Sequence, residues 1–434
     1  MSIYDYEERF GAADKTSKAM KTAIEEWFDL YYLAESREDR DPCQRIAYTV
    51  VNKLVKAMFG EYTATAAEAS YQHLVALLDE SRKQAVQLAL VGGECYLKPC
   101  PHGESFRMTL IPRNHILIFG RDAGGEPTDV GTMERLSRGQ YFYTLLERRS
   151  LDADGCLTIE NKLFRSADGS SLGTQVSLNE IPDYAALQER YRYEVPLGGV
   201  GLVRLKTPML NCVDGSQDGV SVYGAVAGLI RNIDENEAQM NGEFSRGESR
   251  VIVSSDMLRD GKLQDHLFVG LDEDPEAVGM TVYSPQLRVD AYLARKQEYL
   301  RNVESMVGMR RGMLSDANME ERTATEITSS AGDFNLTVIE LQSMWQEGLE
   351  KMLNLCALLA GLYQLHYPQQ MSVSVDWGNS TLYDEDKTWE EYRQMVSMGL
   401  IAPEVALGWR FNLPCATEAE RKIIRERYMP TEKQ

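Results

Sequence analysis

Amphipathic patterns predict helices near the start of the chain. Apolar residues between positions 46 and 58 recur at spacings of three and four, which places them on one face of a helix. They are Ile46, Val50, Val51, Leu54, Val55 and Met58. Asp41-Pro42 precedes them and is typical of a helix start. A second helix is predicted over residues 67–90.

From Gly92 onwards the pattern changes to short apolar segments separated by turn residues. Turn sequences such as Asp154-Gly155 and Asp168-Gly169 punctuate the series. Short apolar runs with this punctuation are typical of strands joined by hairpins. We therefore predict an antiparallel meander, with strands at 94–97, 106–111, 116–119, 141–148, 157–165 and 174–178.

The helical period returns after Val220. One apolar stripe contains Val222, Val226, Leu229, Ile230 and Ile233. A second stripe runs from Val289 to Val307, with Lys296 at one of its positions, and Gly308 ends it. Between the two predicted helices, strand-like segments at 250–254, 266–269 and 281–283 indicate a small β-rich insertion.

A long helix is predicted to begin at Thr323, because Thr323 and Glu326 have the spacing of a capping box. Its pattern continues for about 40 residues, which corresponds to roughly 60 Å of helix. This exceeds the usual helix length of about 11–12 residues, so the helix should span more than one compact domain. A strand at 371–377 follows, then a helix at 384–398. Later helix signals are Gly399, Pro403 and the capping-box pair Thr417 and Glu420. The fold class predicted is α+β, mainly helical.

Composition and charge restrict the classes of function that the chain can have. The chain has 434 residues, and 66 acidic against 46 basic residues give a formal net charge of −20. That excess opposes binding of nucleic acid by bulk charge, but it does not exclude local basic contacts. The longest apolar stretch, 352–363, is shorter than the about 20 residues of a membrane span, and the acidic N-terminus does not resemble a signal peptide. Seven irregularly spaced cysteines predict reduced, mostly buried thiols in a cytosolic setting.

Catalytic and metal-binding motifs are weak. Gly169-Ser-Ser-Leu-Gly173 matches GxSxG, but a nucleophile elbow needs an apolar strand before it and a helix after it. Here a strand-like segment follows, so we predict a hairpin turn. Cys95, Cys100 and His102 provide three candidate metal ligands without a second ligand pair. The sequence predicts no enzyme, no cofactor and no metal site. A hydrolase using Ser171 or the Cys/His group is the enzymatic alternative, and replacing Ser171 by alanine would test it.

Three further segments have two interpretations each. The acidic loop containing Asp272, Glu273, Asp274 and Glu276 is either a solvated loop or a docking surface for a partner. Arg310 and Arg311, in a glycine-containing linker, are either surface residues or phosphate contacts that do not depend on base sequence. The segment 398–403 resembles a helix-turn-helix, but its acidic surroundings favour packing over DNA reading.

The order of these elements resembles the portal proteins of tailed double-stranded DNA bacteriophages, especially those of siphophages. The most similar segments are 288–304, Gly308, and Arg322-Thr-Ala-Thr-Glu-Ile-Thr328, which resembles the start of the family's long helix. Asp376-Trp377, followed by Asp384-Glu-Asp-Lys387 and a helix ending at Gly399, is also similar to the family's C-terminal pattern. The C-terminal region is shorter than the family's usual one.

The resemblance implies a ring, typically of twelve subunits, at one vertex of the virion capsid, assembled in the host cytoplasm. Double-stranded DNA would pass through its channel without sequence specificity during packaging and ejection. The terminase large subunit, then head-completion or adaptor proteins, would dock on it, and the major capsid or scaffolding protein would surround it. No membrane is implied.

The resemblance also implies a division of the chain. Residues 1–220 would form the wing, 221–245 and 288–308 the stem helices, 246–287 the clip and 309–322 the tunnel loop. Residues 323–366 would form the long wing helix and 367–434 the crown region. The residues expected to face DNA are Lys296, Arg310, Arg311 and Arg322, and the acidic clip loop is expected to dock a partner. Another oligomeric head–tail adaptor or scaffold protein is the alternative, although adaptors are usually much shorter.

Overall fold

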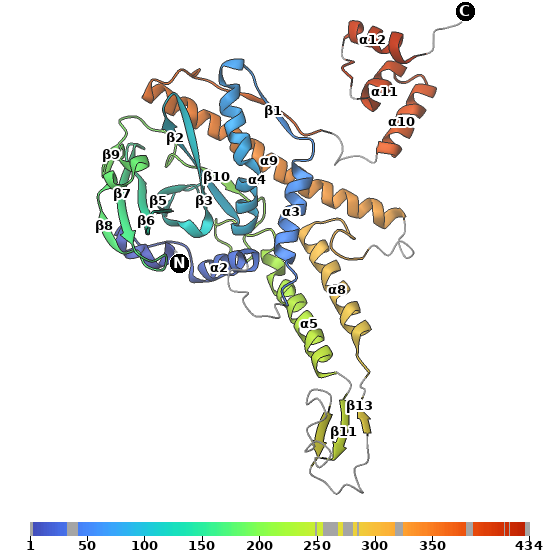
Figure 1. Ribbon diagram of the computed structural model, residues 1–434. Coiled ribbons are helices and arrows are strands. Elements are labelled where there is room, and N and C mark those ends of the chain that lie inside the picture. Colours follow the sequence, from blue (N-terminus) through green and yellow to red (C-terminus); the bar gives the residue numbers. More distant parts are fainter. Residues whose placement is uncertain are drawn as a thin grey trace, which may run out of the picture. The chain divides into compact units, whose positions relative to one another are not determined.

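The computed structural model of the chain contains both helices and sheets, as predicted, with 48% helix and 21% strand (Figure 1). It describes residues 3–32, 42–247, 250–254, 268–271, 281–283, 286–316, 324–378, 385–411, 413–415 and 417–429. The chain divides into two compact units. The main unit contains Met1–Lys56 and Ala64–Ser374, and the C-terminal unit contains Ala57–Thr63 and Val375–Gln434.

The N-terminal helices follow the amphipathic patterns. They are α1 (Glu7–Phe10), α2 (Lys18–Tyr32), α3 (Ile46–Met58) and α4 (Gln72–Gly92). All six residues of the predicted α3 stripe are buried, which confirms that helix. Helix α4 begins five residues later than predicted, because β1 (Thr63–Ala66) and the 3₁₀ helix η2 (Ala69–Tyr71) precede it. The amide of Gln72 contributes to this boundary by accepting a hydrogen bond from the Ala66 N–H at 2.8 Å.

The predicted meander is confirmed as two antiparallel sheets. One has the strand order β10-β2-β3, and the other has the order β4-β5-β6-β7-β8 with β9 paired to β7. The strands are β2 (Glu94–His102), β3 (Ser105–Pro112), β4 (Ile116–Arg121), β5 (Pro127–Arg138), β6 (Tyr141–Leu151), β7 (Leu157–Ser166), β8 (Thr174–Val176), β9 (Arg190–Arg192) and β10 (Val203–Lys206). Short 3₁₀ helices connect parts of this region, namely η3 (Arg113–His115), η4 (Leu178–Glu180) and η5 (Pro182–Tyr184).

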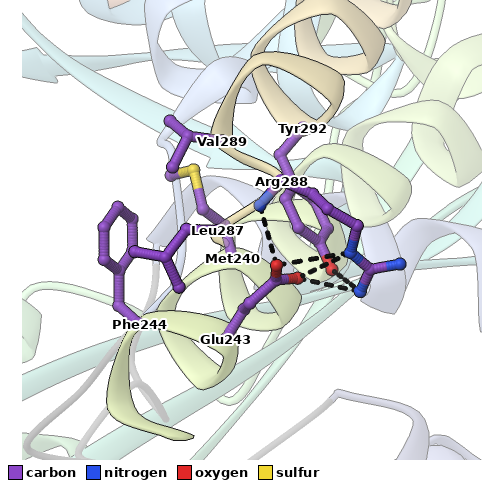
Figure 2. A pocket seen from close by; sticks show the side chains of 7 residues that line it. All are labelled: Met240, Glu243, Phe244, Leu287, Arg288, Val289 and Tyr292. Atoms are coloured by element: carbon purple, nitrogen blue, oxygen red, sulfur yellow. Dashed lines mark hydrogen bonds and ion pairs between the residues drawn. The ribbon is translucent and has the colours of Figure 1, made fainter. Parts of the chain in front are cut away.

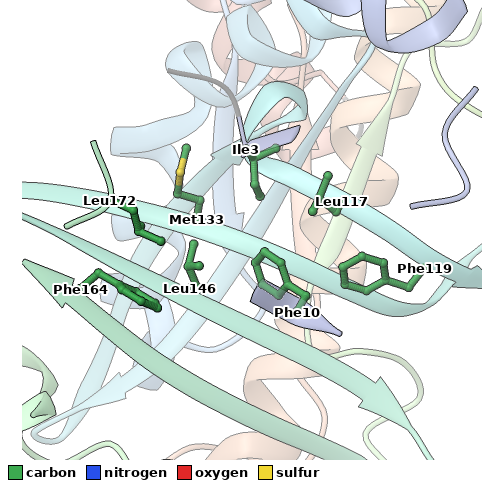
Figure 3. Close-up of a cluster of buried hydrophobic side chains, with 8 residues drawn as sticks. All are labelled: Ile3, Phe10, Leu117, Phe119, Met133, Leu146, Phe164 and Leu172. Atoms are coloured by element: carbon green, nitrogen blue, oxygen red, sulfur yellow. The ribbon is translucent and has the colours of Figure 1, made fainter. Parts of the chain in front are cut away.

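The first residues of the chain cover one face of the larger sheet. Ile3 and Phe10, from η1 (Ile3–Tyr6) and α1, are buried among side chains of β4 to β7 (Figure 3). Leu145 and Leu146 are adjacent on β6 but belong to different apolar clusters, because successive side chains of a strand point to opposite faces. The sheet is therefore buried on both sides. The cluster drawn in Figure 3 consists of Ile3, Phe10, Leu117, Phe119, Met133, Leu146, Phe164 and Leu172.

A buried network of charges joins β2 and β10 to the segment before α5. The carboxylate of Glu94 is fully buried, pairs with Arg204, and accepts hydrogen bonds from the Tyr96 hydroxyl and the Gly219 N–H at 2.6 Å each. Burial alone would raise the pKa of Glu94, but Arg204 and Arg113 outweigh it and hold the pKa at about 2. The carboxylate is thus ionised in the folded chain.

Two helices flank the predicted β-rich insertion. They are α5 (Ala227–Arg246), preceded by η6 (Gly224–Val226), and α8 (Val289–Val307). The insertion contains β11 (Arg250–Ser254), β12 (Phe268–Leu271) and β13 (Thr281–Tyr283), and β11 pairs in parallel with β12 and antiparallel with β13. All three predicted strands are present, and β12 lies about two residues beyond its predicted position. Figure 1 shows α5 and α8 side by side, with the strands joined to their ends.

The long helix is confirmed as α9 (Ala324–Tyr363), 40 residues without interruption. Its expected capping residue, Thr323, lies outside the described residues. Gly348 allows β10 to approach the helix closely, because a Cβ at this position would lie 2.2 Å from a methyl carbon of Leu205. Trp345 and Leu349 are each 1% exposed, so this half of α9 belongs to the core of the main unit.

The described part of the C-terminal unit contains the helices α10 (Glu385–Ser397), α11 (Pro403–Arg410) and α12 (Glu418–Tyr428). Before them, β14 (Val373–Asp376) occupies the predicted strand position and forms a two-stranded sheet with β1. Gly399 has a left-handed φ of 69° after α10, and Pro403 lies in the first turn of α11. The capping box of Thr417 and Glu420 is present at the start of α12. These helix boundaries confirm the predicted start and stop signals.

Candidate functional site

Helices α5 and α8 are held in a fixed register by a buried amide. Asn236 of α5 is 1% exposed, and its Nδ2 donates a hydrogen bond to the backbone carbonyl of Tyr292 on α8 at 3.1 Å. Ile233 of α5 and Val303 of α8 are fully buried apolar residues of the same pair of helices. A shift of one helix along the other would leave the amide and the carbonyl without these partners, which is costly in a buried position.

Lys296 is engaged within the chain. Its Nζ lies 3.1 Å from Glu237 Oε2 on α5 and donates to the side-chain oxygen of Gln44 at 2.6 Å. The backbone N–H of Gln44 in turn donates to Asp234 on α5 at 2.7 Å. These contacts tie the segment before α3 to both helices. The charge of Lys296 is locally matched, so its contact with DNA stays a prediction without support from the geometry.

A second ion pair joins the two helices next to the β-rich insertion. Glu243, near the end of α5, accepts hydrogen bonds from the backbone N–H and the Nη2 of Arg288 at 2.8 Å each (Figure 2). These bonds to Arg288 lower the pKa of Glu243 to about 2. The carboxylate therefore stays charged at neutral pH, and the pair fixes the point at which the chain leaves α5 and enters α8.

The hollow beside this ion pair is too small for a ligand. Figure 2 shows apolar side chains from both helices gathered next to Glu243 and Arg288. The empty space between them is about 120 Å³ and is open to solvent. Ligand pockets commonly measure about 300–1,000 Å³. The lining residues are Met240, Glu243, Phe244, Leu287, Arg288, Val289 and Tyr292.

The loop after α8 is organised by a buried carboxylate. Glu304, on the last turns of α8, is 1% exposed. Its carboxylate accepts hydrogen bonds from the backbone N–H groups of Gly312 at 3.1 Å and Ser315 at 2.8 Å, and also from that of Leu314. The Ser315 hydroxyl donates a further bond at 2.8 Å. Charge-assisted bonds of this kind are stronger than neutral ones, so residues 309–316 are held against the end of α8.

Gly308 makes the turn into this loop. Its φ of 72° lies in the left-handed region, which ends the helix and which other residues adopt only with strain. A Cβ at this position would also lie 2.3 Å from the Thr337 hydroxyl oxygen on α9. The loop therefore turns away from α8 in close contact with the long helix.

The anchored loop presents two basic residues at its surface. Arg310 and Arg311 are both exposed, and they lie between buried Met309 and Gly312, whose N–H is bonded to Glu304. The backbone on both sides of the arginines is thus fixed. Such an arrangement can offer positive charge to an anionic polymer without enclosing it.

The remaining predicted site residues lie outside the described residues. They are Arg322 and the acidic residues Asp272, Glu273, Asp274 and Glu276. Sequence reasoning missed Glu304 and the Glu243–Arg288 pair as organising contacts. A signal for Glu304 exists, because a carboxylate within the apolar stripe of α8, shortly before Gly308 and Gly312, needs donors nearby. The pair of Glu243 and Arg288 has no comparable signal, since both residues are ordinary in exposed helix ends.

The enzymatic motifs are not assembled into catalytic sites. Ser171 lies in the connection between β7 and β8, as predicted for a hairpin turn, and its Oγ lies 2.7 Å from Ser166 Oγ. Cys95, Cys100 and His102 all lie along β2, where Cys95 and Cys100 point to opposite faces because they are five residues apart. Burial raises the pKa of the Cys95 thiol to about 12, which makes it a poor nucleophile.

The thiols and acidic groups of the described residues suggest no other centre. The seven cysteines all lie within the described residues and form no disulfide with one another; Cys95, Cys156 and Cys356 are buried, three others are partly buried, and Cys212 is exposed. Within the described part of the chain, no group of three or more His, Cys, Asp and Glu side chains could hold a metal ion. Helix α11, which follows the turn resembling a helix-turn-helix, packs between α10 and α12.

Comparison with known proteins identifies the family. A family model described as phage portal protein, SPP1 Gp6-like, matches residues 136–425, which is 290 of the 434 residues. The matched region contains α5, the β-rich insertion, α8, the anchored loop and α9. No curated protein matches the chain significantly. None of the described helices has both the length and the apolar character needed to cross a lipid bilayer. The chain belongs to the SPP1 Gp6-like family of phage portal proteins, structural components of the portal vertex of the capsid.

Proposed function

We propose that the chain is the ring-forming subunit of the portal, and that double-stranded DNA passes through the centre of the ring during packaging and ejection. The observation that carries this proposal is the loop after α8, in which Glu304 anchors the backbone and Arg310 and Arg311 are exposed. A loop fixed at its base and basic at its surface is suited to brief contacts with a passing phosphate backbone. The family match supports the assignment.

Our assignment of the parts follows the order of the elements. Residues 1–220 and 323–366 form most of the wing, 221–245 and 288–308 the stem, and 246–287 the clip. Residues 309–322 form the tunnel loop, and 367–434 form the crown region. The polar contacts between α5 and α8, from Asn236 to the Glu243–Arg288 pair, support a stem that acts as one rigid element.

The net charge of −20 suits a conduit. Twelve copies would carry a formal charge of −240, which is twelve times −20, and this background repels DNA over distances of the order of the Debye length, about 8 Å at physiological salt. Exposed arginines on each copy's loop would offset the repulsion locally. The result is weak, exchangeable contact, so DNA is guided without being gripped.

Docking partners are proposed for the clip. The terminase large subunit would bind there during packaging, and head-completion or adaptor proteins would replace it afterwards. The acidic residues Asp272, Glu273, Asp274 and Glu276 would supply negative charge for binding such partners. The Glu243–Arg288 pair supports this role, because it fixes both ends of the chain where they enter the clip.

The test is a packaging assay with portals that carry Arg310→Ala and Arg311→Ala together. We expect packaging to slow several-fold while the native mass of the ring stays unchanged, because the arginines are exposed and the anchoring bonds use the backbone. A matched control replaces exposed Arg107 and Arg190, whose side chains are 61% and 74% exposed, and should package normally. Normal packaging by the loop variant would contradict the proposed contact with DNA. Deletion of residues 309–318 should likewise impair packaging and leave rings intact.

A further inference from the structure

The basic residues of α5 and α8 differ in whether a carboxylate of the chain matches their charge. Four of them lie 2.6, 2.8, 3.1 and 3.7 Å from an acidic side chain, namely Arg231, Arg288, Lys296 and Arg301. Arg246 and Arg295 are exposed, and no carboxylate of the described residues forms an ion pair with either. The charge of these two arginines is therefore available to an anion from outside the chain.

Tyr299 holds the guanidinium of Arg295 in one orientation. The Tyr299 hydroxyl, about one helical turn further along α8, accepts hydrogen bonds from Arg295 Nε at 3.0 Å and Nη2 at 2.8 Å. The guanidinium also lies over the Tyr299 ring, 5.3 Å from its centroid, where a cation is attracted by the ring face. The neutral hydroxyl uses only part of the guanidinium, because Nη1 and one N–H of Nη2 remain as donors. A side chain held in place in advance loses less conformational entropy when it binds a ligand.

Arg295 lies on a flank of α8 that does not face α5. The side of α8 that faces α5 carries Lys296, which pairs with Glu237, and the buried residues Leu300 and Val303. Successive residues of a helix are about 100° apart, so Arg295 lies about 100° from Lys296. Leu293, which is 46% exposed, lies about 160° from Arg295 by the same count. Helix α8 thus has a basic flank and an apolar flank, with the contact to α5 between them.

The flank of Arg295 leads towards the loop with the exposed arginines. Figure 1 shows α8 as one continuous helix between the β-rich insertion and this loop. Arg295 precedes Gly308 by 13 residues, which is about 20 Å along the helix axis. We infer that Arg295 is a second contact for the phosphates of double-stranded DNA, in place of Lys296, whose charge is matched within the chain. The inference rests on the proposed function, and it names the flank of α8 that faces the DNA.

The chemistry of this contact suits a moving polymer. Nη1 and Nη2 of Arg295 can donate to two oxygens of one phosphate, which is the strongest arrangement between an arginine and a phosphate. Each DNA strand presents a phosphate about every 3.4 Å along its axis, so the next phosphate follows closely when one leaves. Contacts to phosphate carry no information on base sequence. Because Arg295 is exposed to water, each contact is weak and is readily exchanged.

Site-specific photocross-linking of the full chain tests the contact directly. Arg295→Cys and Leu293→Cys are made separately in a Cys212→Ser background, which removes the exposed native thiol. Both variants are labelled with p-azidophenacyl bromide, assembled into portals, stalled during packaging of radiolabelled double-stranded DNA and irradiated. We expect several-fold more labelled DNA on the subunit from position 295 than from position 293. Equal yields, or a higher yield from position 293, would overturn the assignment, because the two positions are exposed on different flanks of one helix.

The rate of packaging tests whether the charge of Arg295 matters. Arg295→Gln removes the charge and should slow packaging several-fold while the native mass of the ring stays unchanged. Tyr299→Phe removes the hydroxyl that orients the guanidinium but keeps the charge and the ring, so it should slow packaging less. Arg190→Gln, at a side chain that is 74% exposed, is the matched control and should package at the normal rate.

The outcomes separate this inference from the proposed function. Normal packaging by Arg295→Gln, where the variant of Arg310 and Arg311 packages slowly, would overturn the contact at Arg295 and leave the proposed function intact. Normal packaging by both variants would overturn both. If Arg295→Gln assembled no ring, the comparison of cross-linking at positions 295 and 293 would decide in its place.

Discussion

Glu304 illustrates how one side chain can hold a loop. Replacing it by alanine would leave the buried N–H of Ser315 without its acceptor, together with those of Gly312 and Leu314. We expect a loss of about 2–4 kcal/mol of local stability, since unsatisfied buried donors cost about 1–3 kcal/mol each and partly recover bonds to water. Hydrogen exchange of the amides in residues 309–316 measures this directly. Glu298→Ala, at an exposed position of the same helix, should leave that exchange unchanged, and equal protection in both variants would refute the anchoring role.

Glu94 should make the main unit sensitive to acid. Its pKa of about 2 lies below the usual 4.5, so the folded chain binds fewer protons than the unfolded chain between these values. The stabilisation is complete above about pH 4.5 and is lost as the pH falls towards 2. Its size is about 3 kcal/mol, from 1.36 kcal/mol for each factor of ten in the ionisation constant.

The Glu94→Gln variant tests this pH dependence. It should be less stable at pH 7 by about 3–5 kcal/mol, because buried Arg204 then loses its buried counter-charge and Arg113 is left with Asp218 alone. Its urea midpoint should also fall less than the wild-type midpoint between pH 4.5 and pH 2.5. Some decrease remains, since Arg149 and Lys98 likewise hold the pKa of buried Glu147 at about 2. Glu126→Gln, at a carboxylate that is 61% exposed, is the control and should follow the wild-type curve.

At the scale of elements, sequence patterns predicted helices and hairpins with strong periodicity and missed strands that depend on their neighbours. The apolar stripe of α3 is readable because all of its members are buried on one face. Strand β5 was missed because its second half, including Glu134 and Arg135, is polar. Those side chains are satisfied by partners distant in sequence, such as Lys98 for Glu134 and the Gly169 carbonyl for Arg135.

The sequence indicated where along the chain the candidate site lies, but not which contacts hold it in place. The linker, Arg310 and Arg311 follow from Gly308 and the apolar stripe before it. The anchoring by Glu304 depends on where the backbone of residues 312–315 returns, and no local propensity specifies that. The pairing of Lys296 with Gln44 joins residues 252 positions apart, and a helical pattern contains no information about such a contact.

Lys296 therefore provides a prediction at the level of packed helices. Lys296→Met removes the contacts to Glu237 and Gln44 and leaves the Glu237 carboxylate, 16% exposed, without this partner. We expect a loss of about 1–2 kcal/mol of stability by urea unfolding, more than for a fully exposed pair. Arg295→Met, which removes an exposed neighbour on the same helix, should cost less than about 0.5 kcal/mol. Impaired packaging by a Lys296→Met portal of unchanged stability would instead assign the residue to DNA contact.

At the scale of the whole molecule, the balance between net charge and the exposed arginines predicts how tightly the particle binds free DNA and how strongly that binding depends on salt. Tight binding to DNA shows a slope of about −0.9 for each phosphate neutralised when log K is plotted against log salt. A subunit with a net charge of −20 should retain little DNA at 150 mM salt, and the slope should be shallow.

Filter binding between 50 and 200 mM salt measures this slope for the wild type and for a variant with Arg310→Glu and Arg311→Glu. The two should retain similar, small amounts of DNA, although the variant should package more slowly. If DNA binding by the wild type depended steeply on salt and this dependence disappeared in the variant, the loop would bind DNA tightly. Motion of the DNA would then require the release of several phosphate contacts at every step. A portal that guides DNA by weak contacts avoids that cost, because the repulsion from its acidic background opposes any lasting attachment at the loop.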